Sequence, residues 1–258
     1  MRRFWVPGLI FLFCLLASLL FNMPLSHLLS QTELPDYIRL SNVQQATLLA
    51  GEVDTVEVHG IHATNFRFKN NLSCLLMLKL CYDIEFDQGH GQVSFSAFGG
   101  NLTFTDTRLT YPIETFMVSS SPFPFIPTGN IQIDIDTLNL VQNKISLHQG
   151  RALWSEVGVA GESFDLGEYQ LSVKLIEQAY QFELTDHQAK LEVQGNGQLQ
   201  ADGNYQINID ITSKTSLDQT VKGALELIVN RTGLNQYRYQ QSGTLNPQYM
   251  NYLEFVSH

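Results

Sequence analysis

The sequence predicts a mainly β protein: one N-terminal transmembrane helix followed by an antiparallel, β-rich exported domain. Three observations lead to this class. An apolar run without Asp, Glu, Lys or Arg extends from Phe4 to Thr32. From about residue 90 onward, apolar and polar residues alternate with a period of two, which is typical of half-buried strands. Glycine-rich breaks separate these alternating segments, and no long helical pattern follows the apolar run.

The apolar run predicts a membrane anchor over residues 5–24, preceded by a short cytoplasmic start at residues 1–4. Trp5 to Phe21 is almost entirely apolar, and at about 1.5 Å per residue it gives roughly 26 Å of helix, close to the thickness of a bilayer core. Arg2 and Arg3 favour a cytoplasmic N-terminus. No small-x-small cleavage site follows the run, so a retained anchor is favoured over a removed signal peptide.

Length and charge bound the rest of the chain. About 225 residues follow the anchor, which is enough for one large β domain or two small ones. The formal net charge is −10 at pH 7 and no basic stripe is present, so we expect no nucleic-acid partner. Ser, Thr, Asn and Gln are abundant, as on the solvent-facing side of antiparallel sheets.

The alternating segments are interpreted as antiparallel strands. In chain order they are residues 91–98, 101–110, 130–140, 169–176, 180–184, 189–193, 204–212, 224–229 and 237–245. Residues 41–49 fit either a strand or a short helix. Asp202-Gly203 predicts a tight hairpin, and Gly195-Asn196-Gly197 is interpreted as a further break between strands.

A Pro/Ser-rich connector at residues 119–129 divides the exported part into a first half, 25–118, and a second half, 130–258. The halves share a pattern, because Gly51, Val56 and Phe66 recur as Gly150, Val157 and Phe164. One interpretation is a duplication, with two similar halves forming an extended curved sheet or an open groove. The other is that any two strand-rich segments share alternation and glycine turns.

Two cysteines, Cys74 and Cys81, follow the anchor, and an oxidising compartment would permit a disulfide between them. A straight strand would hold them more than about 20 Å apart, and a helix would separate them by about two turns. A bond therefore requires a turn within residues 75–80, where the sequence carries no turn residue. The alternative is a pair of buried free thiols.

No motif predicts catalysis, a cofactor or a metal, so we expect a protein that is not an enzyme. His59, His62 and His90 lack metal-ligand spacing and are interpreted as surface histidines. Asp134 and Asp136 alternate with isoleucines, which is typical of the solvated face of a strand. The many aromatic residues either fill a sheet core or line an open apolar groove.

Three segments carry a resemblance to a known family: Gly150-Arg151-Ala152-Leu153-Trp154, Leu166-Gly167-Glu168-Tyr169, and the stretch from Leu199 to Tyr205. With the N-terminal anchor, they resemble protein N of the bacterial type II secretion system. The resemblance implies a non-catalytic component of the Gram-negative cell inner membrane, single-pass with a cytoplasmic N-terminus and a periplasmic bulk. Its implied partners are other secretion-system components, which it contacts during assembly and the export of folded proteins.

A second hypothesis remains beside this one. The alternating apolar faces and the two-half organisation would also suit a periplasmic carrier that binds lipid or lipopolysaccharide in a β groove. The presence or absence of co-purified lipid discriminates between a carrier and a scaffold.

Overall fold

The computed structural model describes residues 22–29, 38–44, 46–58, 61–96, 100–116, 126–142, 144–159, 166–187, 189–214, 222–223, 225–226 and 229–255. The chain is mainly β and forms two compact units, residues 1–98 and 99–258. Most of the predicted anchor, residues 5–24, lies outside the described residues. Within the described ranges, no helix is long and apolar enough to cross a bilayer.

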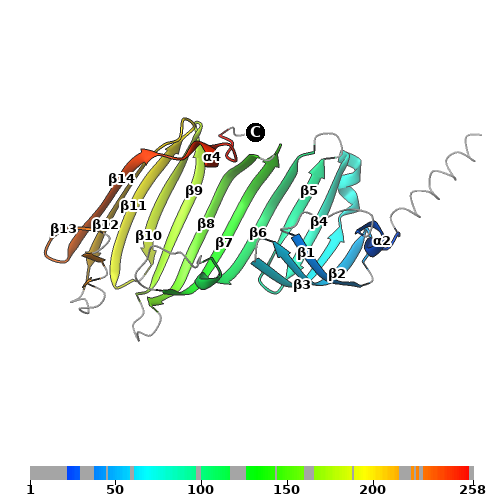
Figure 1. Ribbon diagram of the computed structural model, residues 1–258, viewed down its shortest axis with the longest axis horizontal. Coiled ribbons are helices and arrows are strands. Elements are labelled where there is room, and N and C mark those ends of the chain that lie inside the picture. The colour runs from blue at the N-terminus through cyan, green and yellow to red at the C-terminus, as the bar shows by residue number, and fades with distance from the viewer. Residues whose placement is uncertain are drawn as a thin grey trace, which may run out of the picture. The chain divides into compact units, whose positions relative to one another are not determined.

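The first unit is an antiparallel meander in which each strand pairs with the next along the chain (Figure 1). Its elements are α2 (Leu25–Leu29), β1 (Ile38–Gln44), β2 (Ala50–Val58), β3 (Ile61–Asn70), the 3₁₀ turn η1 (Leu72–Met77), β4 (Lys79–Phe86) and β5 (Gly89–Ser96). On one face the rings of Phe66 and Phe86 stack at 5.9 Å, and Phe68 packs edge-on against Tyr82 at 6.1 Å. These rings and the buried Val53 form the apolar side of the unit.

Between β3 and β4 the chain reverses through η1. Asn71 caps the turn by accepting a hydrogen bond from the backbone N–H of Ser73. Leu78 ends it with a left-handed backbone, φ 56°, and its N–H bonds back to the carbonyls of Cys74 and Leu75. This reversal brings the Cα atoms of Cys74 and Cys81 to 5.9 Å, and a disulfide joins the two residues. The turn that the bond requires therefore forms without glycine or proline, after the capping Asn71.

The second unit is a longer antiparallel sheet in which β6 to β12 follow chain order, with β14 beside β12 and β13 outermost (Figure 1). Its elements are β6 (Leu102–Pro112), η2 (Ile113–Phe116), β7 (Pro127–Val141), β8 (Lys144–Val159), β9 (Glu168–Ile176), β10 (Ala179–His187), β11 (Leu191–Gln200), β12 (Asn204–Ser213), β13 (Asn230–Gly233), β14 (Gln236–Thr244) and α4 (Pro247–Met250).

The buried core of this unit lies on one face, where the C-terminal segment crosses the sheet. Leu175, Tyr180 and Leu199 pack against Phe255, whose ring meets that of Tyr180 edge-on at 5.1 Å. The Tyr180 hydroxyl donates to the carbonyl of Glu254 and accepts from the N–H of Leu147. The C-terminal segment is thus fastened to β8 and β10.

The predicted connector, 119–129, does not coincide with the boundary between the two units. β6 pairs with β7 over ten residue pairs from Leu102↔Leu140 to Pro112↔Asn130, so the structure joins strands that the sequence interpretation assigns to different halves. Strand bounds nevertheless recur at a spacing close to 100 residues. β4 begins at residue 79 and β10 at 179, and β6 begins at 102 and β12 at 204. The proposed duplication is consistent with this spacing.

Two local predictions are wrong. Gly195-Asn196-Gly197 is no break but the middle of β11, where its residues pair with Leu184 to Phe182 on one side and Ile209 to Ile207 on the other. A Cβ on Gly195 would lie 3.1 Å from side-chain atoms of both Leu184 and Ile209, so glycine makes room for these larger neighbours.

The strand predicted at 224–229 lies partly outside the described residues. Of its described positions, 225 and 226 are helical and Val229 is not in a strand, and the edge strand β13 begins at Asn230. The N–H of Val229 bonds to the carbonyl of Leu225, which is the spacing of a helical turn.

Candidate functional site

The sheet of the second unit has one face built mainly from polar side chains. In antiparallel pairs, directly opposed residues point to the same face, so the register defines rows that cross the sheet. One row crosses eight strands from β6 to β14 and consists of Arg108, Asp134, Arg151, Ser172, Glu183, Asn196, Asn208 and Gln240. We call the face that carries this row the polar face.

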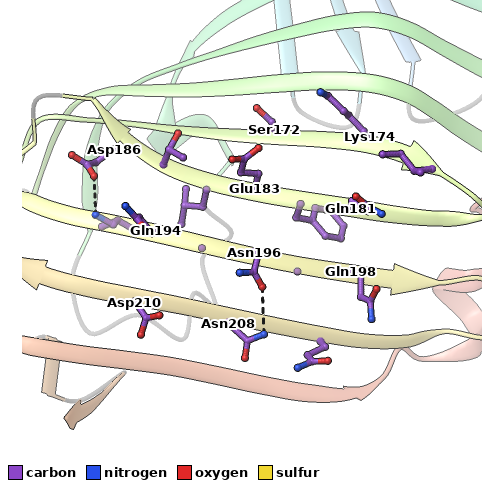
Figure 2. A pocket seen from close by; sticks show the side chains of 18 residues that line it. Ser172, Lys174, Gln181, Glu183, Asp186, Gln194, Asn196, Gln198, Asn208 and Asp210 are labelled. Carbon is purple, nitrogen blue, oxygen red and sulfur yellow. Dashed lines mark hydrogen bonds between the residues drawn. The ribbon is translucent and has the colours of Figure 1, made fainter.

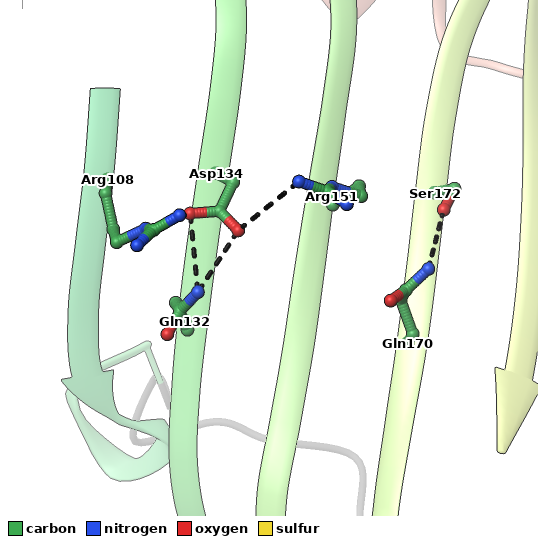
Figure 3. Close-up of polar contacts among 6 residues, drawn as sticks. All are labelled: Arg108, Gln132, Asp134, Arg151, Gln170 and Ser172. Carbon is green, nitrogen blue, oxygen red and sulfur yellow. Dashed lines mark hydrogen bonds and ion pairs between the residues drawn. The ribbon is translucent and has the colours of Figure 1, made fainter. Parts of the chain in front are cut away.

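At the β6 end of the row, Asp134 lies between two arginines (Figure 3). Arg108 Nε donates to Asp134 Oδ1 at 2.5 Å, Gln132 Nε2 donates to Asp134 Oδ2 at 3.1 Å, and Arg151 Nη2 lies 4.0 Å from Oδ2. Partial burial by itself would raise the pKa of Asp134, but the hydrogen bonds from Arg108 and Gln132 and the two positive charges outweigh it and lower the pKa. Asp134 is therefore a structural carboxylate that ties three strands together.

Further along the row, strands β9 to β12 enclose an open hollow of about 1010 Å³ (Figure 2). Side-chain amides dominate its lining. Asn208 Nδ2 donates to Asn196 Oδ1 at 3.5 Å, and Gln240 Nε2 from β14 donates to Asn208 Oδ1 at 3.3 Å. Four further amides of the lining form no side-chain hydrogen bond within the described part of the chain: Gln181, Gln194, Gln198 and Gln206.

Two carboxylates of the hollow are paired with cations. Lys214 Nζ lies 3.3 Å from Asp186 Oδ2, and Arg238 Nε donates to Asp210 Oδ1 at 2.6 Å. The lining also contains the charged Lys174 and Glu183, and beside them its amides offer neutral donors and acceptors suited to the amides of a polypeptide or the hydroxyls of a polyol. Two carboxylates held in ion pairs are not set up as an acid and base pair.

The opposite face of the same sheet is apolar. Its central row consists of Leu109, Ile133, Ala152, Leu171, Leu184, Gly195, Ile209 and Tyr239. Leu171 is exposed, whereas the buried cluster around Tyr180 and Phe255 covers only the end of the sheet that the C-terminal segment crosses.

Much of the family resemblance lies in Trp154 and in residues Leu166–Tyr169. These residues connect neighbouring strands. Trp154 Nε1 donates to the carbonyl of Thr128 on β7. The backbone of Leu166 bonds to Val157 on β8 and accepts from Lys190 beside β11. Gly167 has φ +99°, and a Cβ there would lie 2.5 Å from the Cα of Ala189. These positions are structural.

The other sequence-predicted residues do not assemble into a site. His59 lies outside the described residues. His62 faces Glu57 at 4.0 Å, and His90 is exposed on β5. Asp136 is exposed at a β-bulge of β7, two residues after Asp134 but outside its ion pairs. No group of three or more metal-ligating side chains occurs within the described ranges.

Sequence reasoning missed the hollow. Many of its residues belong to predicted strands, whose alternation indicates only a solvated face, and Gly195-Asn196-Gly197 is interpreted from sequence as a break. The signal was the residue type: Gln or Asn occupies successive outward positions at 194, 196 and 198 and at 206 and 208.

The second unit is thus an antiparallel sheet with one polar and one apolar face, and its Trp154 and Leu166–Tyr169 segments connect neighbouring strands. The family model for type II secretion system protein N matches residues 45–240, most of the chain. The chain belongs to this family and is a component of type II secretion. No curated relative and no solved structure matches the chain. Family membership implies contacts with other type II secretion components and a place in the cell envelope.

Proposed function

We propose that this chain is a single-pass inner-membrane protein whose β-rich part lies in the periplasm and acts without catalysis, by contacting other secretion components during assembly and export. The family supports the role, and the uncharged run at residues 4–32 supports the anchor. The contact mode is addition of a strand to the open edge of β14.

The partly unpaired edge of β14 is the observation that supports this contact mode. Along its whole length it pairs with β12, from Gln236↔Thr212 to Thr244↔Asn204. On its other side, β13 reaches only Gln236, Tyr237 and Arg238. Residues 239–244 leave that side without a strand partner in the described part of the chain and carry no charge and no proline. Proteins normally protect such edges with charges, proline or bulges, so an unprotected edge supports a partner strand.

Ser242→Lys tests the edge, because a lysine on an edge strand opposes pairing with another chain. Gln170→Lys is the matched control: Gln170 also lies on the polar face and outside the hollow, but its strand β9 is paired on both sides, with Leu153 and Thr185 opposite this position. We expect Ser242→Lys to lower secretion in a complemented deletion strain while Gln170→Lys does not. Normal secretion by both variants, or an equal loss in both, would refute strand addition at this edge.

The anchor has its own test. Residues 1–30 are replaced by a cleavable signal peptide, and secretion and membrane fractionation are compared with the intact chain. We expect the intact chain to fractionate with the inner membrane and secretion to fall on release of the body. Full secretion by the released body would show that tethering is not essential.

The apolar face of the second unit favours a lipid or lipopolysaccharide carrier as a second candidate. Leu171 is exposed at the centre of this face, between the end that the C-terminal segment covers and the end where Leu191, Val193 and Tyr237 are buried. Native mass spectrometry of the detergent-purified protein distinguishes the two functions. Co-purified lipid released by Leu171→Asp supports a carrier, and its absence supports the scaffold.

A further inference from the structure

The turn η1 and the residue after it form the most apolar exposed surface of the first unit. Leu76 is 91% exposed, Met77 is 74% exposed and Leu78 is 61% exposed, and Leu72 and Leu75 are exposed as well. None of the six residues of η1 is buried. We call residues 72–78 the apolar loop. Soluble surfaces tolerate scattered apolar side chains, but five large ones in seven consecutive residues mark a contact site.

The structure holds the apolar loop in one shape. The disulfide between Cys74 and Cys81 closes it, and the N–H of Asn71 bonds to the carbonyl of Cys81 at 2.8 Å across its base. The left-handed Leu78 fixes the last turn through bonds to Cys74 and Leu75. A pre-organised loop loses little conformational entropy when its side chains enter an apolar phase.

The base of the apolar loop is fixed to the segment beside the end of the predicted anchor. Pro24 forms a β-bridge with Thr47, and the N–H of Leu25 bonds to the carbonyl of Ala46 at 2.6 Å. Two residues further on, the carbonyl of Leu49 accepts from the N–H of Asn70 at 2.6 Å. The carbonyl of Leu48 accepts from the Tyr82 hydroxyl at 3.1 Å. Asn70 and Tyr82 flank the loop, and α2 and η1 lie at the same end of the first unit in Figure 1.

Charge agrees with this position. In a chain of net charge −10, residues 71–82 contain no Asp or Glu, and their single charge is that of the exposed Lys79. A lysine beside an apolar cluster can reach lipid head groups while the cluster enters the acyl region.

We propose that the apolar loop inserts into the outer leaflet of the membrane that holds the N-terminal anchor, as a second, shallow attachment next to the anchor's exit. This inference rests on the proposed anchoring. Apolar elements of this kind sit roughly 5–10 Å deep at the boundary between head groups and acyl chains. Two attachments would fix the orientation of the first unit on the membrane surface, which a single helix leaves free to rotate.

The test uses the full chain, reconstituted in vesicles of phosphatidylethanolamine and phosphatidylglycerol. The fluorescent amino acid dansylalanine replaces Leu76 in one variant and Leu234 in the matched control. Leu234 is 85% exposed in the β13–β14 turn of the second unit. Lipids that carry nitroxides at known depths then quench the label. We expect emission from position 76 to shift to the blue, with a quenching depth of about 5–10 Å, and position 234 to remain in water.

A photo-crosslinking amino acid at the same two positions gives an independent readout and is expected to capture phospholipid only at position 76. Labels that stay in water at both positions, or crosslinks from position 76 only to protein, would overturn the proposal. Failure of the proposed location is recognised separately. A chain absent from the inner-membrane fraction refutes the anchor, whereas an anchored chain with residue 76 in water refutes only the apolar loop's insertion.

Discussion

Removal of one hydroxyl, by Tyr180→Phe, measures how firmly the C-terminal segment is fastened to the second unit. The Tyr180 hydroxyl donates to the carbonyl of Glu254 at 2.8 Å and accepts from the N–H of Leu147 at 3.1 Å. The ring is 4% exposed and packs against Phe255. Phenylalanine preserves the ring and its contacts, so the variant isolates the polar fastening.

The expected loss follows from these two bonds. Each neutral hydrogen bond contributes about 0.5–1.5 kcal/mol net, and the loss is larger where the partner left behind is buried. We therefore expect Tyr180→Phe to lower the free energy of unfolding by about 2 kcal/mol. Tyr180→Leu should cost about 1 kcal/mol more, because the edge-on aromatic pair with Phe255 is also lost.

Urea unfolding of the full chain in a mild non-ionic detergent, followed by near-ultraviolet circular dichroism, gives the free energy. Tyr249→Phe is the control, because that ring is 63% exposed and its change should stay within about 0.5 kcal/mol. Equal stabilities of Tyr180→Phe and Tyr249→Phe would refute the fastening.

The pH dependence of the same variant provides a second check. Burial raises the pKa of Tyr180 by more than the hydrogen bonds from Leu147 and Ser146 lower it. A raised pKa in the folded state means that the stability from this tyrosine is complete below the unfolded pKa near 10 and is lost as pH rises through the folded pKa. The difference between wild type and Tyr180→Phe should therefore shrink above about pH 10. A difference that stays constant there would contradict burial of the hydroxyl.

Two further predictions concern single side chains of the second unit. Asp134→Asn should lower the free energy of unfolding by about 1–2 kcal/mol at pH 7, because charge-assisted bonds to Arg108 are lost. Since the pKa of Asp134 is lowered, its contribution is present above the unfolded pKa near 3.9 and disappears as pH falls through the folded pKa. Acid-unfolding curves of Asp134→Asn and the exposed control Asp136→Asn check this, and coincident curves would contradict it. Gly167→Ala should cost more than about 2 kcal/mol, because φ +99° is strained for alanine and its Cβ would meet the backbone of Ala189. Gly100→Ala has φ +64° and open space around it, so thermal unfolding should show a smaller loss of about 1 kcal/mol, and equal losses would argue against the clash.

Alternation predicted most of the strands of the second unit because one face of that sheet is apolar and the other polar. It failed at Gly195-Asn196-Gly197, where the reason for glycine is space for Leu184 and Ile209 in adjacent strands. The sequence pattern of one segment does not show which side chains of neighbouring strands lie beside it. β8 was not predicted as a strand. In the structure, register shifts interrupt its pairing with β7.

The apolar loop shows a different limit. Residues 75–80 contain no turn residue, yet a left-handed leucine reverses the chain and a disulfide closes the reversal. A disulfide can hold a turn that the local sequence does not signal. The hollow was hidden for another reason: amides on alternating positions mark both an ordinary wet surface and a binding surface, and only the sheet's register brings them together.

The amide-lined hollow has a consequence for any molecule that rests on it. Glutamine and asparagine neither gain nor lose protons, and their dipoles are not screened by dissolved ions as full charges are. The hydrogen bonds that these amides offer therefore keep their strength when the surroundings turn acidic, alkaline or salty, unlike those of Lys174 and Glu183 in the same hollow. In the proposed periplasmic location, a polar molecule held by the amides would stay bound through changes in the external medium that weaken contacts between full charges.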